Sequence, residues 1–380
     1  MMIRYASYFI AALLPLLLFR WFAPVSIGEI DFWLLWLLAM LLVSLPVVYA
    51  EIALAYRSAE APVAGMQKLT READASSLWR SFGWLAALVS IVIAALVISG
   101  ASTGILNALA DLNSAPNVPN FAIAAGLMVI AVLLSLLGVA PLPIGLGLMV
   151  VGLLFGVANG LPNIAFAMTG VSLSEWARAV ALALVSVGAG TGLYWFGQNL
   201  ASKQAVTALG ADNRQTQLSS RSHAAQEYRA TKLVLPIWVL QLVVGIIALF
   251  MSGMALPPIG QLLYWVGVLF VVSYLLHYST QQLAHKFGLL VSVVLTFVVA
   301  LLLVVAIPTN WLVGILVIVS SIAVLLLSVF AGWQMKISHL RKSLNFGNEA
   351  FYNLWRVAIR LIVPLALLLA LIGWVMQWLS

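Results

Sequence analysis

Two ionisable side chains interrupt long apolar stretches of this sequence, where a charge is costly. Glu51 falls near the end of the run 32–56, and His277 falls in the lower part of the run 260–282. An ionisable group at membrane depth is a candidate for ligand binding or proton transfer, and histidine titrates near neutral pH. Either residue could bind a proton. Each also has a structural alternative: a glutamate can anchor a hydrogen-bond network, and a histidine near a helix end is more often packed or interfacial.

Two other apolar runs contain helix-breaking residues near their middle. Pro15 lies within the run 5–24, and proline removes a backbone donor and clashes with the preceding turn. The run 177–201 contains Gly188, Gly190 and Gly192, which weaken a helix considerably. Corresponding breaks in two halves of a chain are typical of transporters with a binding site at mid-membrane. The alternative is helix packing, because glycine and proline are frequent in membrane helices.

The composition indicates that the bilayer is the solvent of most of this chain. Of its 380 residues, 64% are hydrophobic and 8% are charged, whereas a soluble domain has about 25% charged residues. No polar stretch is long enough for a separate soluble domain, so residues 1–380 are predicted to form one transmembrane domain. The net charge of +7 is attributed to basic cytoplasmic loops and not to nucleic acid binding.

Apolar runs of about 20 residues predict an all-α membrane protein of about eleven transmembrane helices. Five fall in 5–159, five in 177–333 and the last in 355–378. The predicted spans are 5–24, 32–56, 82–110, 120–138, 142–159, 177–201, 233–253, 260–282, 288–306, 310–333 and 355–378.

Basic residues support this threading. Sixteen of the 18 Lys and Arg residues fall at the N-terminus or in alternate connections, and only Arg20 and Arg178 fall on the other side. Because cytoplasmic loops collect Lys and Arg, we expect a cell inner membrane location with the N-terminus in the cytoplasm and the C-terminus outside. The loop 57–81 is expected to form a short surface helix, and the polar stretch 202–232 a cytoplasmic loop or interfacial helix.

Several short motifs occur in an order that resembles one known family. The second span contains LPVVYAEIAL at 45–54, followed by APVAG at 61–65 and FGWL at 82–85. The sixth span has Trp176, Ser186 and then the segment 190–192, and FAGW stands at 330–333. This order is similar to that of the neurotransmitter:sodium symporter family, over nearly the whole chain.

The resemblance implies a LeuT-type fold, a 5+5 inverted repeat in which helices 1 and 6 are broken. It implies a bundle of helices 1, 2, 6 and 7 that rocks against helices 3, 4, 8 and 9. It also implies substrate binding beside the two breaks and an outer gate at Arg20. The substrate-binding candidates are Pro15, Leu96, Val97, Val185, Ser186, Gly188, Gly190, Thr191 and Gly192.

The chain also departs from the family pattern. The first span lacks the glycines and asparagine of the family, and Leu96 or Val97 replaces a substrate-orienting tyrosine. Covering aromatic residues of the sixth helix align with Val185 and Thr191. The hydroxyl pair that ligates sodium aligns with Leu275 and Leu276, which cannot replace the cation's hydration shell, so the sodium sites are expected to be degraded. Thr309 stands where Arg20 would find an acidic partner; Glu29, Asp31 or Glu175 could substitute.

Two functions remain open at this stage. The first is a secondary transporter of a small, rather apolar amino acid or amine, and the second is a non-transporting membrane scaffold or accessory subunit. An enzyme is not expected, because no metal-ligand cluster, phosphate-binding loop or nucleophile constellation is present, and no cofactor is implied. The expected partners are a small-molecule substrate and the lipid bilayer, and a second copy of the chain or a partner membrane subunit stays open.

Overall fold

The computed structural model describes residues 2–379 except 25, 27, 113–117, 161, 163 and 198–228. All regular secondary structure in this described part is helical, and an isolated β-bridge joins Glu29 and Ala167. Among the described residues, eight helical stretches are long and apolar enough to cross a membrane, and two shorter apolar helices accompany them. The all-α prediction of a multi-pass membrane protein is therefore confirmed.

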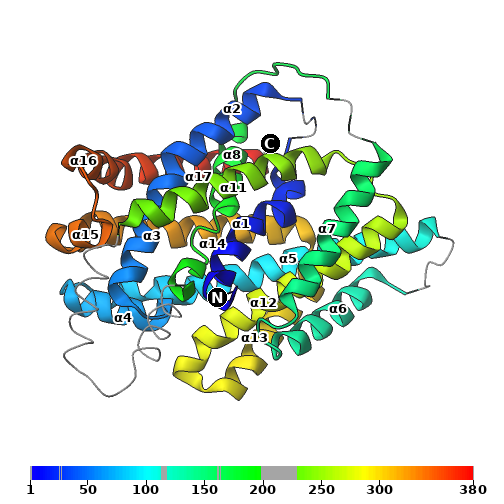
Figure 1. Cartoon of the computed structure of the whole chain (residues 1–380), viewed down its shortest axis with the longest axis horizontal. Helices are drawn as coiled ribbons and strands as arrows, with labels where there is room; N and C mark the ends of the chain where they lie inside the picture. Colours follow the sequence, from blue (N-terminus) through cyan, green and yellow to red (C-terminus); the bar gives the residue numbers. More distant parts are fainter. Residues whose placement is uncertain are drawn as a thin grey trace.

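The first half of the chain supplies the central helix α1 and helices on either side of it (Figure 1). A π-helical turn joins two of them into one continuous span, Ile30–Ser58. The elements are α1 (Met2–Phe22), α2 (Ile30–Ala39), η1 (Met40–Ser44), α3 (Leu45–Ser58), α4 (Pro62–Glu72), η2 (Ser77–Arg80), α5 (Ser81–Asp111), α6 (Asn120–Ser135) and α7 (Leu142–Asn159).

The second half begins with a helix that is interrupted, and it ends with two long spans that contain π-helical turns. The elements are α8 (Leu173–Ser186), α11 (Ala230–Ser252), α12 (Pro258–Phe287), α13 (Leu289–Ala306), α14 (Thr309–Val329), η3 (Phe330–Gln334), α15 (Ile337–Leu344), α16 (Glu349–Val357), η4 (Ala358–Ile362) and α17 (Val363–Leu379). Each predicted span corresponds to one of these helical stretches, with most ends displaced by a few residues.

Two packing groups meet at the centre. The long helix α12 packs most extensively on α7 and α5, whereas α1 packs on α11 and α8. In Figure 1, α1 lies in the middle of the bundle, with α8, α11 and α14 around it. A single cluster of buried apolar side chains runs through both groups. A membrane helix that is buried on all sides serves the interior of a bundle and not the lipid surface.

The connection 57–81 contains the expected short helix, α4, followed by the 3-10 turn η2. Met66 and Leu69 are fully buried, so α4 packs one apolar face against the bundle. The polar loop predicted at 202–232 falls mostly outside the described residues. Which connections are cytoplasmic and which lie outside stays a prediction from the distribution of Lys and Arg.

Candidate functional site

The sixth predicted span is broken at its glycines. Helix α8 ends at Ser186, the segment 187–192 is irregular, and helical structure resumes over 193–197. Gly188, Gly190 and Gly192 have φ angles of 62°, 75° and 73°. Left-handed backbone of this kind is unfavourable for residues with a Cβ atom, so the glycines allow the chain to leave the helix here. The predicted break is confirmed.

The expected break at Pro15 is wrong. Helix α1 continues from Met2 to Phe22 with Pro15 in its interior. Proline removes one donor and crowds the preceding turn, which can bend a helix without unwinding it. The surrounding residues of α1 are Ala11, Leu14 and Leu17, which favour helix, and all are buried against neighbouring helices. Without left-handed glycines, packing holds this helix together across the proline.

Side chains from three other helices hold the backbone of the break, the segment 187–192. The Gly190 N–H donates to Glu51 Oε1 of α3 at 2.6 Å. Gln241 Nε2 of α11 lies 3.4 Å from the carbonyl oxygen of Val187, which also accepts from the hydroxyl of Tyr194. Ser90 Oγ of α5 donates at 3.5 Å to the carbonyl oxygen of Thr191. These bonds replace helical ones, because unpaired backbone groups are costly at membrane depth.

The break also satisfies part of its own backbone. The hydroxyl of Thr191 donates to the carbonyl oxygen of Gly188 at 2.6 Å and accepts from the Leu193 N–H at 3.3 Å. Thr191 therefore stabilises the turn, and its hydroxyl is engaged within it. The backbone carbonyls of Val187, Gly188 and Thr191 are therefore already bonded by protein groups.

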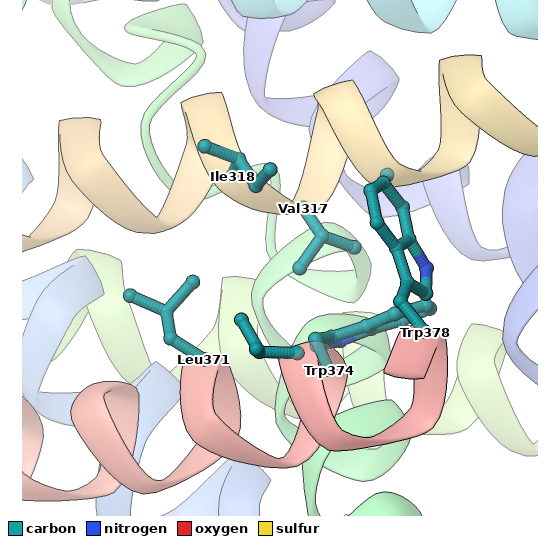
Figure 2. A pocket seen from close by; sticks show the side chains of 7 residues that line it. Val317, Ile318, Leu371, Trp374 and Trp378 are labelled. Atoms are coloured by element: carbon teal, nitrogen blue, oxygen red, sulfur yellow. The ribbon is translucent and has the colours of Figure 1, made fainter. Parts of the chain in front are cut away.

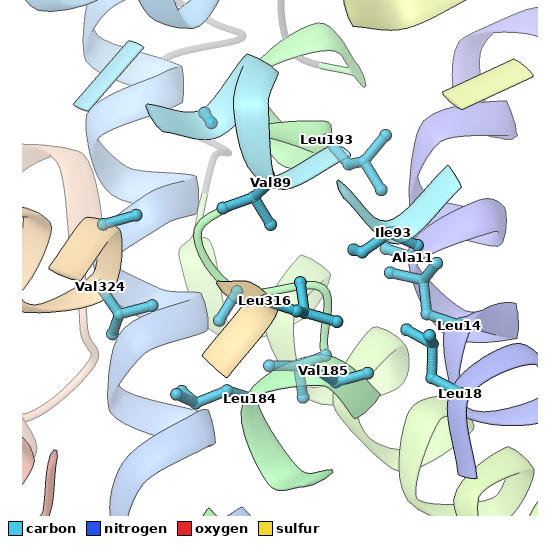
Figure 3. Packing of buried hydrophobic residues seen from close by; sticks show 14 of the residues in the cluster. Ala11, Leu14, Leu18, Val89, Ile93, Leu184, Val185, Leu193, Leu316 and Val324 are labelled. Atoms are coloured by element: carbon cyan, nitrogen blue, oxygen red, sulfur yellow. The ribbon is translucent and has the colours of Figure 1, made fainter. Parts of the chain in front are cut away.

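Apolar side chains fill the space beside the break. Figure 3 shows these residues around the segment, from α1, α5, α8, α14 and the helical stretch 193–197: Ala11, Leu14, Leu18, Val89, Ile93, Leu184, Val185, Leu193, Leu316 and Val324. A Cβ atom on Gly190 would lie 3.2 Å from the Cβ of Ala323. The candidates Leu96 and Val97 are fully buried in the same cluster, and Val185 is 4% exposed. The site is closed in this structure.

Four polar atoms around this closed site have no hydrogen-bond partner among the described residues. They are Glu51 Oε2, Ser186 Oγ, Gln241 Oε1 and the Tyr278 hydroxyl. Only Ser186 and Glu51 were singled out from the sequence; Ser90, Tyr194, Gln241 and Tyr278 were missed. Gln241 carried a signal, since an amide in the middle of an apolar span is itself unusual.

The positions that align with sodium-binding hydroxyls are apolar and inaccessible. Leu275 and Leu276 of α12 are both fully buried in the hydrophobic cluster. Neither side chain offers an oxygen to a cation, and a hard cation requires several. The nearby hydroxyl of Tyr274 is engaged with Ser7 Oγ at 2.8 Å.

His277 does not take part in the central site. Its Nδ1 lies 2.9 Å from the carbonyl oxygen of Ser135, at the C-terminal end of α6, and its ring lies beside Gly138. One residue further along α12, Tyr278 instead approaches the break, with its hydroxyl near Gly192. Successive helical residues point about 100° apart, so His277 and Glu51 are not brought together. The geometry agrees with the structural role for His277.

The prediction that Arg20 forms an ion pair at the outer gate is wrong for the described residues. The Arg20 guanidinium lies over the rings of Trp21 and Trp265, 5.4 Å and 5.2 Å from their centroids. The three acidic residues proposed as partners are occupied elsewhere. Asp31 accepts from the N–H groups of Thr169 and Gly170 at 2.7 Å and 2.8 Å.

The other two acids also serve local backbone. Glu175 forms a capping box with Ser172 at the start of α8, and Glu29 accepts from the Ser26 N–H at 3.4 Å. Thr309, at the position of the expected acid, instead pairs with Ser99 Oγ at 2.7 Å and links α14 to α5. A neutral hydroxyl pair and a cation–π contact therefore stand where an ion pair was expected.

A separate small apolar pocket lies on the side of the bundle between α14 and α17. Figure 2 shows Val317 and Ile318 facing Leu371, Trp374 and Trp378 across it. The residues of α14 that face the break, such as Leu316 and Val324, are not among those that line this pocket. It is therefore distinct from the closed site.

No family model and no curated protein matches the sequence. Among solved structures, the chain is similar to "Crystal structure of MhsT in complex with L-phenylalanine", with a TM-score of 0.68 and 16% sequence identity. The match covers 97% of this chain and 98% of that chain. Together with the interrupted α8, it defines the class: this is a polytopic membrane protein with the LeuT fold.

Proposed function

We propose that this chain is a secondary transporter of a small, rather apolar amino acid or amine, and a divergent member of the neurotransmitter:sodium symporter family. The observation that supports transport most directly is the interruption of α8 over 187–192, with its left-handed glycines. An interrupted helix at membrane depth is unfavourable and persists where surrounding structure over-determines it, typically at ligand or switch sites. In transporters such breaks surround the substrate.

The lining of the break supports an apolar substrate. Leu14, Ile93 and Leu316 converge on it, and the structural neighbour was crystallised with L-phenylalanine. Ser186 offers one fully buried hydroxyl without a partner in the described residues. A substrate that enters must displace apolar side chains and supply a polar group to this hydroxyl, which suits a small amphipathic molecule.

The coupling proposed here does not use the family's usual sodium cage. Leu275 and Leu276 provide no ligand oxygen, and α1 is continuous at Pro15. We therefore expect sodium to stabilise the purified protein no more than potassium or choline does. A ligand bound to the folded state at 100 times its Kd adds about 2.7 kcal/mol, so a sodium-specific shift in melting temperature would be visible and would contradict this expectation.

One observation favours the alternative of a non-transporting scaffold. The space beside the break is filled by protein, and side chains of α3, α5 and α11 bond its backbone. A chain that had lost its substrate would relax toward such a filled core, since empty volume is destabilising.

Thermal-shift measurements on the purified protein with a panel of amino acids and amines distinguish the two functions. We expect at least one apolar member of the panel to raise the melting temperature. Ser186→Ala should weaken that binding about tenfold, because a buried hydroxyl bonded to ligand is lost. Ser135→Ala is the matched control, since Ser135 is a buried serine that bonds its own helix at Val132. A panel without any response would support the scaffold.

A further inference from the structure

The carboxyl group of Glu51 is fully buried beside the break, and only one of its two oxygens has a hydrogen-bond partner among the described residues. Oε1 accepts the Gly190 N–H at 2.6 Å, across 139 positions of sequence. Oε2 has no hydrogen-bond partner among the described residues. One oxygen of this carboxyl therefore fixes the backbone of the interrupted helix, while the other is available to hold a proton.

Two buried tyrosines, Tyr194 and Tyr278, interact electrostatically with Glu51. The Tyr278 hydroxyl lies 2.8 Å from where a Cβ of Gly192 would stand, and it too has no partner in the described part of the chain. Two oxygen atoms without a partner among the described residues, Glu51 Oε2 and the Tyr278 hydroxyl, thus belong to side chains that approach the same turn of backbone.

No positive charge compensates Glu51 within the described residues. Among elements packed against α3, neither η1 nor α14 contains a titratable side chain. The others, with α3 itself, contribute Tyr49, Tyr56, Arg57, Lys68, Arg71, Glu72, Lys232, His339, Arg341, Lys342 and Arg360. None of these forms an ion pair or a hydrogen bond with Glu51, and Arg57 is instead paired with Glu72.

The balance of energies decides which form of the carboxyl fits this closed site. Burial of a carboxylate without a countercharge is strongly unfavourable, even after relaxation. One hydrogen bond to a charged group returns only part of that cost. The single bond from Gly190 cannot offset the loss of hydration, so the neutral acid is compatible with the closed break and the carboxylate requires water to enter.

We propose that Glu51 is a proton-binding site that couples proton exchange to opening of the interrupted helix. This inference rests on the proposed transport function and supplies its coupling ion. With the proton on Oε2, the neutral carboxyl fixes Gly190 and the break stays closed. Transfer of that proton to water breaks only the O–H bond, leaves a carboxylate and draws water to the inner side of 187–192.

Infrared spectroscopy of the purified protein tests the proton site directly. At neutral pH we expect a carbonyl band of a protonated, buried carboxylic acid that is lost in Glu51→Gln. Asp31→Asn is the matched control, because Asp31 is also buried, at 9% exposure, but accepts two backbone N–H groups. Loss of the band in Asp31→Asn with retention in Glu51→Gln would overturn the proposal.

Cysteine labelling tests the coupling. The chain has no native cysteine, and Leu193 is a fully buried residue beside the break. The ratio of open to closed protein should rise about tenfold per pH unit in a one-proton equilibrium, so the open fraction rises steeply below the midpoint and levels off above it. Labelling of Leu193→Cys should therefore rise more steeply with pH in the otherwise unchanged chain than with Glu51→Gln, which retains the neutral bond to Gly190. Equal slopes would overturn the coupling.

A conservative variant keeps the test informative if Glu51→Gln folds poorly. Tyr278→Phe removes the nearby hydroxyl and retains the ring that packs on Phe196. We expect Tyr278→Phe to shift the midpoint of the labelling-against-pH profile without abolishing the pH dependence. An unchanged midpoint would contradict an influence of the Tyr278 hydroxyl on proton binding by Glu51. The infrared band does not depend on transport. A protein that shows the band but binds no substrate would refute the proposed function alone, whereas substrate binding without the band would refute the proton site alone.

Discussion

Two helices of this protein contain residues expected to break them, and only one is broken. Helix α1 passes through Pro15 without interruption, whereas the helix that begins with α8 stops at Ser186 and resumes at residue 193. The difference lies in what each residue type changes. Proline removes a donor but has a φ angle suited to helix, while glycine makes left-handed backbone accessible. Leaving a buried helix therefore requires glycines together with side chains that bond the released backbone.

The largest effect is expected at Gly192. A Cβ there would lie 2.6 Å from the Pro62 Cγ and 2.8 Å from the Tyr278 hydroxyl, at a φ of 73°. Left-handed strain contributes about 1–2 kcal/mol and overpacking about 1–3 kcal/mol, so Gly192→Ala should lose about 2–5 kcal/mol of unfolding free energy.

Unfolding of the purified protein in mixed detergent measures this loss. Gly126→Ala is the control, because that helical glycine of α6 has no neighbouring atom within 4 Å of the added Cβ. A similar small effect in both variants would mean that the break is not held in the left-handed conformation described here.

Removal of the bonds that hold the break should have an intermediate effect. Gln241→Leu deletes the contacts with the Val187 carbonyl and the Tyr194 hydroxyl. The groups left behind are buried, so a loss of about 1–3 kcal/mol is expected. Hydrogen exchange at the amides of 187–192 should rise in this variant, and unchanged protection would show that Gln241 does not restrain the segment.

Pro15→Ala tests the unbroken helix. A donor is restored at position 15 within continuous helix, so α1 should become more stable by up to about 3 kcal/mol, the difference in helix propensity. The net gain should be smaller, since Pro15 is buried and its ring leaves a gap. Melting curves show whether the stability of the variant rises or falls. A clear destabilisation would mean that α1 requires the irregularity at this position.

The smallest effect is expected from charge outside the core, at Glu72 of α4. Its Oε2 accepts from Arg57 Nε at 2.9 Å, and its Oε1 lies 3.3 Å from His339 Nδ1. Burial alone would raise the pKa of Glu72, but the hydrogen bond and charge of Arg57, with His339 and Lys68, lower it below its ordinary value. The stabilisation is therefore present above the unfolded pKa and is lost as pH falls through the folded pKa.

Glu72→Gln should remove the loss of stability at acid pH. At neutral pH it should cost less than about 1 kcal/mol of stability, since the pair is partly exposed. Melting temperature measured against pH for the variant and the unchanged chain checks the expectation. A pH dependence on the alkaline side that vanishes in Glu72→Gln would contradict the assignment, because that response is expected from Glu51.

Much of the fold follows from local pattern. Runs of about 20 apolar residues coincide with the helices of the structure, and the glycines at 188, 190 and 192 coincide with the break. Less of the candidate site could be predicted from the sequence. Ser186 and Thr191 were identified, but the engagement of Thr191 within its own turn and the contribution of Gln241 from α11 were not. Hydropathy indicates that a helix is buried without indicating which neighbour its polar side chain meets.

The sequence by itself determined the membrane class, the positions of the spans and the position at which one helix is interrupted. These features depend on composition and on residues close in the chain. Tertiary structure decided what happens at that place. The bond from Glu51 to Gly190, the apolar filling by Leu14, Ile93 and Leu316, and the stacking of Arg20 on Trp265 all join residues far apart in sequence. Burial and desolvation are properties of the packed bundle, and they determine whether a carboxyl is paired, neutral or free to exchange a proton.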